Sequence, residues 1–229
     1  MKILHEDDNI IVCVKPSGIA TQSADLRSKD MVSLIKTHLV RSARKNKKSL
    51  NGEPYVGLIH RLDQPVAGIL VFAKDRESAA NLSQQVTNNQ IKKYYYALVE
   101  GEFKDDKMHK EKKVAKDGTV YIEDEIVKIP GANAAIVNTP IQEEPVKRTK
   151  LEYKVIKSIN GNTLIEVHLI TGRFHQIRAT MSYIGNPIVG DVRYGARDKL
   201  PKGAIALCCY KLCFKHPITN KDMSFVIEP

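Results

Sequence analysis

The segment HRLDQPVAGILVFAKD, residues 60–75, places a cluster of charged side chains directly before an apolar run. Gly68 to Ala73 (GILVFA) has the length and composition of a buried β-strand. His60, Arg61 and Asp63 therefore fall in the loop that enters this strand. Such loops display reactive groups on a rigid scaffold. The segment predicts a strand whose entry loop carries a candidate catalytic carboxylate, Asp63.

The rest of the chain predicts many strands and few helices. Strands are expected at residues 3–14, 55–59, 92–99, 119–122, 150–157, 163–170, 205–214 and 223–227. Helices are expected at 30–45 and 77–86, and a turn followed by a helix that starts near Phe174 at 172–184. Asn160-Gly161 predicts a hairpin between two of the strands. Residues 102–148 are expected to form hairpins and irregular loops. This mixture favours the α+β class over a parallel βαβ array.

The amino-acid composition of the chain is typical of a globular protein. The 229 residues are 42% hydrophobic, and no run approaches the roughly 18 apolar residues of a membrane helix. The N-terminus lacks the pattern of a secretory signal, so a cytoplasmic location without membrane contact is expected. The cysteines, at 13, 208, 209 and 213, have neither zinc nor disulfide-framework spacing and are expected to be free thiols.

The charge balance favours a polyanionic partner. Thirty-six Lys and Arg against 26 Asp and Glu give a net charge of +10, which suits contact with nucleic-acid phosphates. The segment from Arg41 to Lys48 is strongly basic. It has two interpretations, a phosphate-contacting edge or a solvated loop, and the second is the default for a run of charges.

Each candidate group has a structural alternative. Asp63 suits a nucleophile or base kept ionised by nearby cations, or an ordinary surface ion pair with Arg61. In the strand at 92–99, Tyr94 and Tyr96 share one face and Tyr95 the other. A tyrosine there either stacks on a base or packs in the core.

The segment GRFHQIR, residues 172–178, adds a third candidate group. His175 and Arg178 lie three residues apart and share a helix face. His175 suits general acid–base chemistry or a hydrogen bond within the fold, and we favour the second. No further ligand follows at a suitable spacing, so a metal site is not expected.

Taken together and in order, these segments resemble the RluA-like family of RNA pseudouridine synthases. Lys15-Pro16-Ser17-Gly18 is similar to its N-terminal signature, and residues 60–75 resemble its catalytic motif, His-Arg-Leu-Asp-x-x-Thr-Ser-Gly followed by an apolar strand. KKYYYALVEG (92–101) is similar to its tyrosine motif, and GRFHQIRATMSYIGNPIVGDVRYG (172–195) to its Gly-Arg-Thr-His-Gln-Ile-Arg segment and the continuation. Val66-Ala67 stands where Thr-Ser is usual, and Phe174 where Thr is usual.

The resemblance implies a role for particular residues. Asp63 matches the catalytic aspartate, and Arg61 the arginine that enters the RNA stack where the target base leaves. Tyr95 matches the tyrosine that stacks on the target uracil, and Arg178 the arginine that pairs with the aspartate. The neighbouring residues expected to contact RNA are His60, Arg173, His175 and Gln176.

The resemblance also implies fold and activity. A mixed, mostly antiparallel sheet with flanking helices and a central RNA-binding cleft is expected. The chain is expected to be a monomeric single catalytic domain, residues 1–229, without the accessory N-terminal RNA-binding domain of many relatives. It would isomerise uridines in ribosomal RNA or transfer RNA stem-loops by base flipping, with no cofactor and no metal.

Two rival functions remain. A non-catalytic RNA-binding domain would not require Asp63, whose charge repels phosphates. A hydrolase would need a second carboxylate in a comparable motif, and the sequence offers none.

Overall fold

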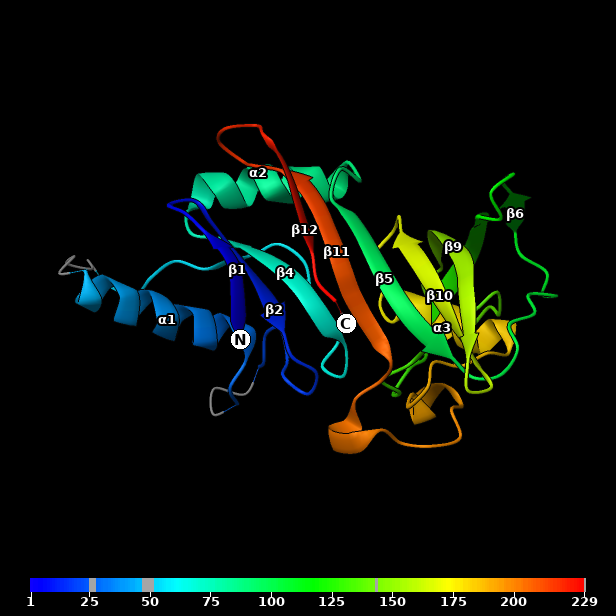
Figure 1. The fold of residues 1–229 in the computed structure, drawn as a ribbon. Coiled ribbons are helices and arrows are strands. Elements are labelled where there is room, and N and C mark those ends of the chain that lie inside the picture. The colour runs from blue at the N-terminus through cyan, green and yellow to red at the C-terminus, as the bar shows by residue number, and fades with distance from the viewer. Residues whose placement is uncertain (25–27, 47–51, 143, 229) are drawn as a thin grey trace. The chain divides into compact units, whose positions relative to one another are not determined.

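The computed structural model describes residues 1–24, 28–46, 52–142 and 144–228 (Figure 1). The chain divides into two compact units. The first unit combines Met1–Ile91 with Tyr210–Glu228, and the second is Lys92–Cys209. The expectation of one catalytic domain over residues 1–229 stays a prediction.

The first unit is built on a sheet with strand order β1-β2-β4-β11. β12 pairs with β11, β3 pairs with β4, and the pairs β1–β2, β2–β4, β3–β4 and β11–β12 are antiparallel. The bounds are β1 Lys2–Glu6, β2 Ile10–Lys15, β3 Gly57–Leu58, β4 Ala67–Ala73, β11 Leu207–Lys215 and β12 Asp222–Val226. β11 runs out of the second unit into the first.

The single strand predicted at 3–14 is wrong, because the structure has two strands there, β1 and β2. A turn at residues 7–9 separates them, and one Asp7 carboxylate oxygen accepts hydrogen bonds from the backbone N–H groups of Asn9 and Ile10, both at 2.9 Å. The Asp7 side chain thus does what a backbone carbonyl does in a turn. The signal for the break was the polar run Glu6-Asp7-Asp8-Asn9.

The described part of the first unit forms two helices, and both were predicted. α1 covers Met31–Lys45 and α2 covers Arg76–Thr87. Asp30 accepts a hydrogen bond from Ser33 N, and the Ser33 hydroxyl accepts one from Asp30 N, so the two residues close a reciprocal cap on α1. Asp75 caps α2 through Ser78 N. The basic segment partly forms the end of α1, whereas its Lys47 and Lys48 lie outside the described residues.

The core of the first unit lies between its sheet and α2. Antiparallel pairing sets Val12 opposite Val71, and both belong to an apolar cluster that includes Leu82 of α2 and Phe214 of β11. Every residue of β4 from Gly68 to Ala73 is buried, because the strand is covered on both faces. The charged entry loop is therefore anchored to one of the most enclosed strands of the chain.

The second unit has strand order β5-β10-β9-β7-β6, with β8 paired to β7. All five of these pairings are antiparallel. The bounds are β5 Lys92–Val99, β6 Glu111–Val114, β7 Val120–Lys128, β8 Ala135–Val137, β9 Lys147–Ile159 and β10 Asn162–Leu169. The predicted hairpin joins β9 to β10, and both turn residues, Asn160 and Gly161, have the positive φ that its tight turn requires.

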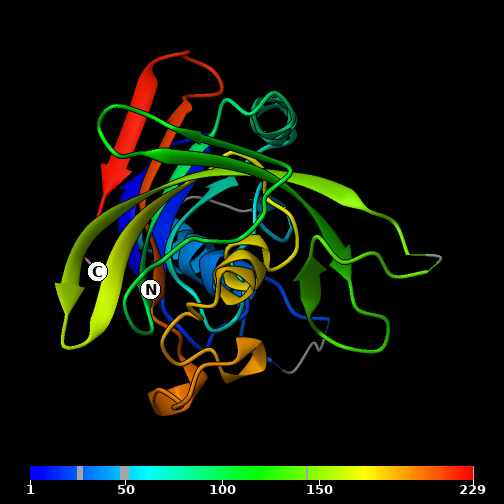
Figure 2. The ribbon, with the colours of Figure 1, turned by 90° about the vertical axis from the view of Figure 1, so that its right-hand side faces the viewer.

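The helices of the second unit follow β10. They are α3 at Gln176–Ile184 and two short 3₁₀ helices, η1 at Val192–Tyr194 and η2 at Pro201–Gly203. Figure 2 shows α3 under the arch of the curved strands of this unit. Ala179 of α3 packs with Ile126 of β7, Val137 of β8 and Tyr194 of η1. Gly185, with φ of 98°, ends the helix.

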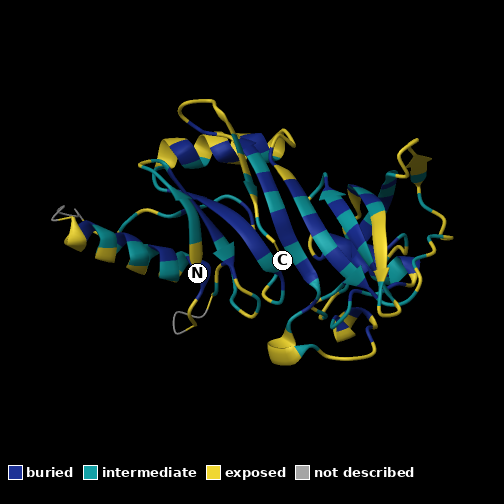
Figure 3. Ribbon diagram, in the orientation of Figure 1, coloured by how far each residue is buried: buried dark blue, intermediate teal, exposed yellow. Residues whose placement is uncertain are grey.

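Burial alternates along β5 as predicted from its tyrosines. Figure 3 shows buried and half-buried residues as stripes along the strand. Tyr95 is buried, whereas Tyr94 and Tyr96 are half-buried. Tyr95 thus lies on one face and its two neighbours on the other.

Residues 102–148 contain the predicted hairpins and a buried ionic cluster. The His109 ring bonds the Asp124 carboxylate at 2.7 Å and the Asp105 carboxylate at 2.9 Å, and its side chain is fully buried. The Tyr153 hydroxyl of β9 donates a hydrogen bond to Asp105, and the Tyr183 hydroxyl of α3 donates one to the carbonyl of Met108. We call these residues the His109 cluster; it fastens an otherwise irregular segment to β9 and α3.

The α+β class and the mostly antiparallel pairing are confirmed. The predicted central cleft stays a prediction. The four cysteines are free thiols, and burial raises the pKa of Cys13 to about 12 and of Cys208 to about 11. Across the residues that the structure describes, we find no helix with both the length and the apolar character that crossing a bilayer requires.

Candidate active site

Asp63 lies in a tight turn of the first unit that enters β4. Its backbone carbonyl accepts a hydrogen bond from Val66 N at 3.0 Å, with Gln64 and Pro65 between them. The turn closes through the backbone alone, so Val66 needs no side-chain hydroxyl to form it. Asp63 itself is half-buried.

Lys15 lies beneath this turn and is fully buried. Its ammonium donates hydrogen bonds to the backbone carbonyls of Ile19 at 2.7 Å, Gln64 at 3.0 Å and Pro16 at 3.1 Å. Burial lowers the pKa of Lys15 to about 8, and the negative charge of Asp63 opposes that shift. Lys15 thus cross-links the loop after β2 to the Asp63 turn and adds a positive charge near the carboxylate.

Further bonds join the same two loops. The buried Thr21 hydroxyl donates to the Leu62 carbonyl at 2.8 Å and accepts from Leu62 N at 3.1 Å. Ser17 donates to the Pro65 carbonyl at 2.8 Å, and Gly18 N donates to the Gln64 carbonyl at 2.8 Å. The residues on both sides of Asp63 are therefore held by direct bonds, which fixes the position of the carboxylate.

The two basic residues of the catalytic motif have different surroundings. His60 is buried, and its Nε2 accepts a hydrogen bond from Val71 N of β4 at 3.4 Å. Arg61 is exposed. Their expected contacts with RNA stay predictions. The exposed side chain of Arg61 suits such a contact better than the buried side chain of His60 does.

In the second unit, Tyr95 lies in β5 opposite Val167 of β10 and is buried. On the other face of the strand, the Tyr94 ring stacks on His168, with centroids 4.6 Å apart and an angle of 16° between the rings. Stacking by Tyr95 on a target base stays a prediction.

Arg178, near the start of α3, is buried with Asp191. Its Nε donates to one carboxylate oxygen of Asp191 at 2.6 Å and its Nη2 to the other at 2.8 Å. This fork geometry orients both side chains. The guanidinium also lies 4.9 Å from the centroid of the Tyr194 ring. The pairing of Arg178 with Asp63 stays a prediction; its bonds to Asp191 were not foreseen.

His175 hydrogen-bonds within the fold, as favoured from the sequence. Its Nδ1 lies 3.0 Å from the Tyr194 hydroxyl and its Nε2 2.9 Å from Nη1 of Arg178. The expected helix start near Phe174 is wrong, because α3 begins at Gln176 and His175 precedes it; the two side chains meet although His175 is not on the helix. His175 also has a positive φ of 53°, a strained conformation that is common at functional sites.

Gln176 secures the loop that precedes α3. Its side-chain oxygen accepts hydrogen bonds from the Thr171 hydroxyl at 2.9 Å and from Arg173 N at 3.1 Å. Its amide nitrogen donates to the Lys150 carbonyl of β9 at 3.1 Å. Gln176 is buried and Arg173 is exposed. The RNA contacts expected of Arg173, His175 and Gln176 stay predictions.

Sequence reasoning missed three structural supports of the site. Lys15 entered only as part of a family signature, and Asp191 and Tyr194 were quoted without a role. The sequence did hold a signal for Asp191, which follows Gly190 and the apolar pair Ile188-Val189. A carboxylate next to such an apolar pair is a candidate for burial, and a buried carboxylate needs a partner. In the described ranges, no three His, Cys, Asp or Glu side chains gather in a way that a metal ion could use.

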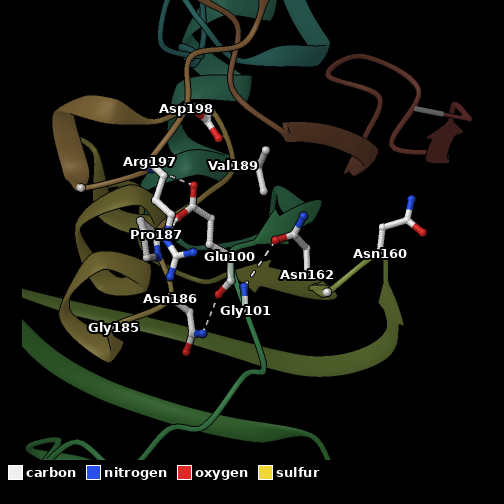
Figure 4. A pocket seen from close by; sticks show the side chains of 12 residues that line it. Glu100, Gly101, Asn160, Asn162, Gly185, Asn186, Pro187, Val189, Arg197 and Asp198 are labelled. Atoms are coloured by element: carbon white, nitrogen blue, oxygen red, sulfur yellow. Dashed lines mark hydrogen bonds and ion pairs between the residues drawn. The ribbon is translucent and has the colours of Figure 1, made fainter.

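A separate hollow of about 640 Å³ lies in the second unit (Figure 4). It contains none of the predicted site residues. Asn186 at its wall donates to the carbonyls of Glu100 and Glu102, and Asn162 accepts from Gly101 N. Both amide side chains therefore make hydrogen bonds within the fold.

The comparison with known proteins agrees with the motifs. The profile of a family described as RNA pseudouridylate synthase matches residues 9–183. An uncharacterized RNA pseudouridine synthase of Aquifex aeolicus is 30% identical over 250 residues, covering 100% of this chain and 69% of that protein. Ribosomal large subunit pseudouridine synthase D of Nitrosomonas europaea is 29% identical over 218 residues, covering 90% and 53%.

Solved structures show the same fold. Human RNA Pseudouridylate Synthase Domain Containing 4 has a TM-score of 0.69 at 21% identity, covering 99% of this chain and 88% of that one. Human RNA Pseudouridylate Synthase Domain Containing 1 has a TM-score of 0.72 at 17% identity, and the match covers 100% of this chain and 83% of that one.

The chain spans 53% of the Nitrosomonas relative and 69% of the Aquifex relative. The family match nevertheless covers most of this chain and includes the Asp63 turn, β5 and most of α3. The motifs, the fold and the profile lead to the same conclusion: the chain belongs to the RNA pseudouridylate synthase family, whose enzymes are isomerases.

Proposed function

We propose that this chain converts uridine to pseudouridine in structured RNA, with Asp63 as the catalytic carboxylate. The reaction breaks the bond between N1 of uracil and C1′ of ribose, turns the base, and joins C5 to C1′. The proton on C5 is lost and N1 gains one, so the RNA keeps its mass. Neither a redox step nor a transferred group is involved, so the proposal requires no cofactor and no metal.

The observation that carries the proposal is the way Asp63 is held. Hydrogen bonds from Lys15, Ser17 and Thr21 fix the backbone around a half-buried carboxylate. Such bonds are costly to leave unmade and restrict motion of the turn. Positioning of this kind favours catalysis, because a reacting group displaced by about 1 Å loses roughly a hundredfold in rate.

The other residues have proposed roles around the flipped base. A paired or stacked uridine hides its reacting atoms, and extruding it costs a few kcal/mol. Arg61 would fill the vacated space, and Tyr95 would support the uracil. Arg178 would pair with Asp63. A guanidinium has five N–H donors, so its bonds to Asp191 and His175 are compatible with such a pair.

Ribosomal RNA is the first substrate to test, ahead of transfer RNA. The Nitrosomonas relative and a 29% identical relative of Vibrio vulnificus are both named for the large ribosomal subunit. The net charge of +10 suits either RNA. We propose that the chain acts in the cytoplasm as a monomer.

The test is deletion of the gene in its host, followed by mapping of pseudouridine across ribosomal and transfer RNA. Complementation uses the wild type, Asp63→Asn and the matched control Asp8→Asn, which makes the same change at an exposed aspartate. Specific pseudouridines should vanish on deletion, return with the wild type and Asp8→Asn, and stay absent with Asp63→Asn.

Return of the modification with Asp63→Asn would contradict the assignment of the catalytic carboxylate. Purified protein that binds RNA from the deletion strain without forming pseudouridine would favour the rival, a non-catalytic RNA-binding domain. A hydrolase would instead cut the RNA or release uracil.

A further inference from the structure

Phe174 is an exposed aromatic residue in a loop that the rest of the second unit holds rigid. It stands where the resembled motif usually has threonine, so the family pattern assigns it no role. A single exposed apolar residue is ordinary. What sets Phe174 apart is the contact beneath its ring and the charge around it.

One face of the Phe174 ring lies flat on the ring of His175. The two centroids are 3.8 Å apart and the rings differ by 17°. His175 is itself buried and bonded to Tyr194 and Arg178. Phe174 is 37% exposed, although its ring rests on this firmly held support.

The backbone around Phe174 is fixed as well. Gln176 N donates to the Arg173 carbonyl at 3.1 Å, closing a turn across Phe174 and His175. The Gln176 side chain binds Arg173 N from the other side of that turn. Because this loop is already fixed, binding a ligand at the ring costs the protein little conformational entropy, and this favours binding.

Cations surround this aromatic surface. The ammonium at the flexible end of the Lys128 side chain lies over the Phe174 ring, 5.6 Å from its centroid. Arg173 Nε donates to the Arg148 carbonyl at 3.3 Å, and the Arg148 side chain is 79% exposed. Nη1 of Arg148 lies 3.8 Å from a carboxylate oxygen of Glu123, which is also paired with Lys150.

An aromatic face among cations suits an unpaired nucleotide, whose base stacks and whose phosphates carry the opposite charge. We propose that Phe174 is a stacking platform for an unpaired base of the RNA substrate, with Lys128, Arg148 and Arg173 contacting adjacent phosphates. This inference rests on RNA being the substrate, as proposed above. Because every base has an aromatic face, the platform selects unpaired RNA and not a particular sequence.

The direct test uses the absence of tryptophan from the sequence. Phe174→Trp in the whole chain places a single indole at the platform, and a stacked base quenches indole fluorescence. The matched control, Val155→Trp, places one at a 47% exposed position of β9. An oligouridylate of about twelve nucleotides serves as the probe, a length within the usual range of single-strand sites.

We expect the oligouridylate to quench the indole fluorescence of Phe174→Trp in a saturable way and to leave that of Val155→Trp unchanged. On a transcript of large-subunit ribosomal RNA, Phe174→Leu should raise KM about tenfold, with a smaller effect on kcat, as loss of one stacking contact predicts. Phe174→Tyr should restore KM because it restores the ring.

Unchanged emission of Phe174→Trp, when filter retention shows the oligouridylate bound, would overturn the platform. Failure to retain the oligouridylate at all would overturn it too. The proposed function fails separately: if Asp63→Asn keeps wild-type turnover while Phe174→Trp is quenched, the platform stands and the catalytic assignment falls.

Discussion

Lys15 shows at the residue scale how one buried charge can hold the turn that carries a candidate catalytic residue. A lysine is seldom fully buried unless its charge is compensated. Here backbone carbonyls and the nearby Asp63 supply the compensation. The ammonium helps to hold together the loop after β2 and the Asp63 turn, beyond the last residue pair of β2 and β4.

Replacing Lys15 by methionine should therefore damage catalysis more than folding. Lys15→Met keeps an unbranched, flexible side chain but removes the ammonium donor from the carbonyls of Ile19 and Gln64, of which Gln64 keeps the bond from Gly18 N. The free energy of unfolding should fall by about 2 kcal/mol, and kcat by at least about tenfold because Asp63 is no longer fixed. Urea unfolding and pseudouridine assays measure the two effects.

The control is Lys2→Met, which removes an exposed lysine of β1. It should match the wild type in both assays. A Lys15→Met protein that is folded and turns over at the wild-type rate would show that the cross-link does not position Asp63.

The residues of the site were predictable from the sequence to different degrees. Asp63 and Arg178 were found because they stand in motifs. Lys15 and Asp191 were not given roles, because their importance comes from partners 49 and 13 residues away along the chain. Periodicity and local spacing describe neighbours in sequence and carry no information on such contacts.

At the scale of elements, the His109 cluster determines how a poorly patterned segment is held. Burial would lower the pKa of His109, but its hydrogen bonds to Asp105 and Asp124 outweigh burial and raise the pKa to about 9. For Asp105, burial would raise the pKa, but bonds from His109, Tyr153 and Lys112 hold it well below its usual range. The imidazolium and the carboxylates therefore stabilise each other.

The directions of these two pKa shifts determine how the free energy of unfolding depends on pH. His109 has a folded pKa above its unfolded value of 6.5, so its contribution is complete below that pH and is lost as pH rises through about 9. Asp105 has a lowered pKa, so its contribution is lost only in acid, below its usual value of 3.8. Together they favour the folded state most between these two unfolded values.

We predict that the free energy of unfolding falls between pH 6.5 and pH 9 by up to about 3 kcal/mol from His109. His109→Gln should be less stable at low pH and should lose this dependence. Denaturant titrations of both proteins across that range provide the measurement. Lys107→Gln, a change at an exposed residue of the same segment, should behave as the wild type. An equally steep fall in His109→Gln would assign the effect to other groups.

Elements with a regular pattern were predicted well, and the exceptions have physical causes. β5 was predicted with the observed bounds, and the hairpin at Asn160-Gly161 follows from turn chemistry. The break between β1 and β2 was missed because apolar residues on both sides concealed an aspartate turn. The predicted strand at 119–122 extends in the structure to Lys128, since pairing with β9 outweighs its charged sequence.

At the scale of the whole molecule, the positive charge should make RNA binding strongly salt-dependent. Each phosphate contact contributes about −0.7 to −0.9 to the slope of log K against log salt. Arg148→Gln and Arg173→Gln should each reduce the size of that slope by about 1, because each removes one proposed contact. Filter binding across a range of KCl concentrations gives the slopes.

Arg76→Gln, at the exposed start of α2 in the first unit, serves as the control and should leave the slope unchanged. If Arg148→Gln and Arg173→Gln both kept the wild-type slope, the surface beside Phe174 would not contact phosphates.

The first unit draws its sheet from both ends of the chain, with Leu212 and Phe214 of β11 completing a core begun by β2 and β4. During synthesis, the ribosome releases the Asp63 turn long before it releases β11, whereas residues 92–209 emerge without interruption. The second unit is therefore free to fold first on the ribosome, and the first must wait until β11 and β12 have been released. A chain that stops at Cys209 would keep the Phe174 loop and lack the strand segments that complete the core behind the Asp63 turn.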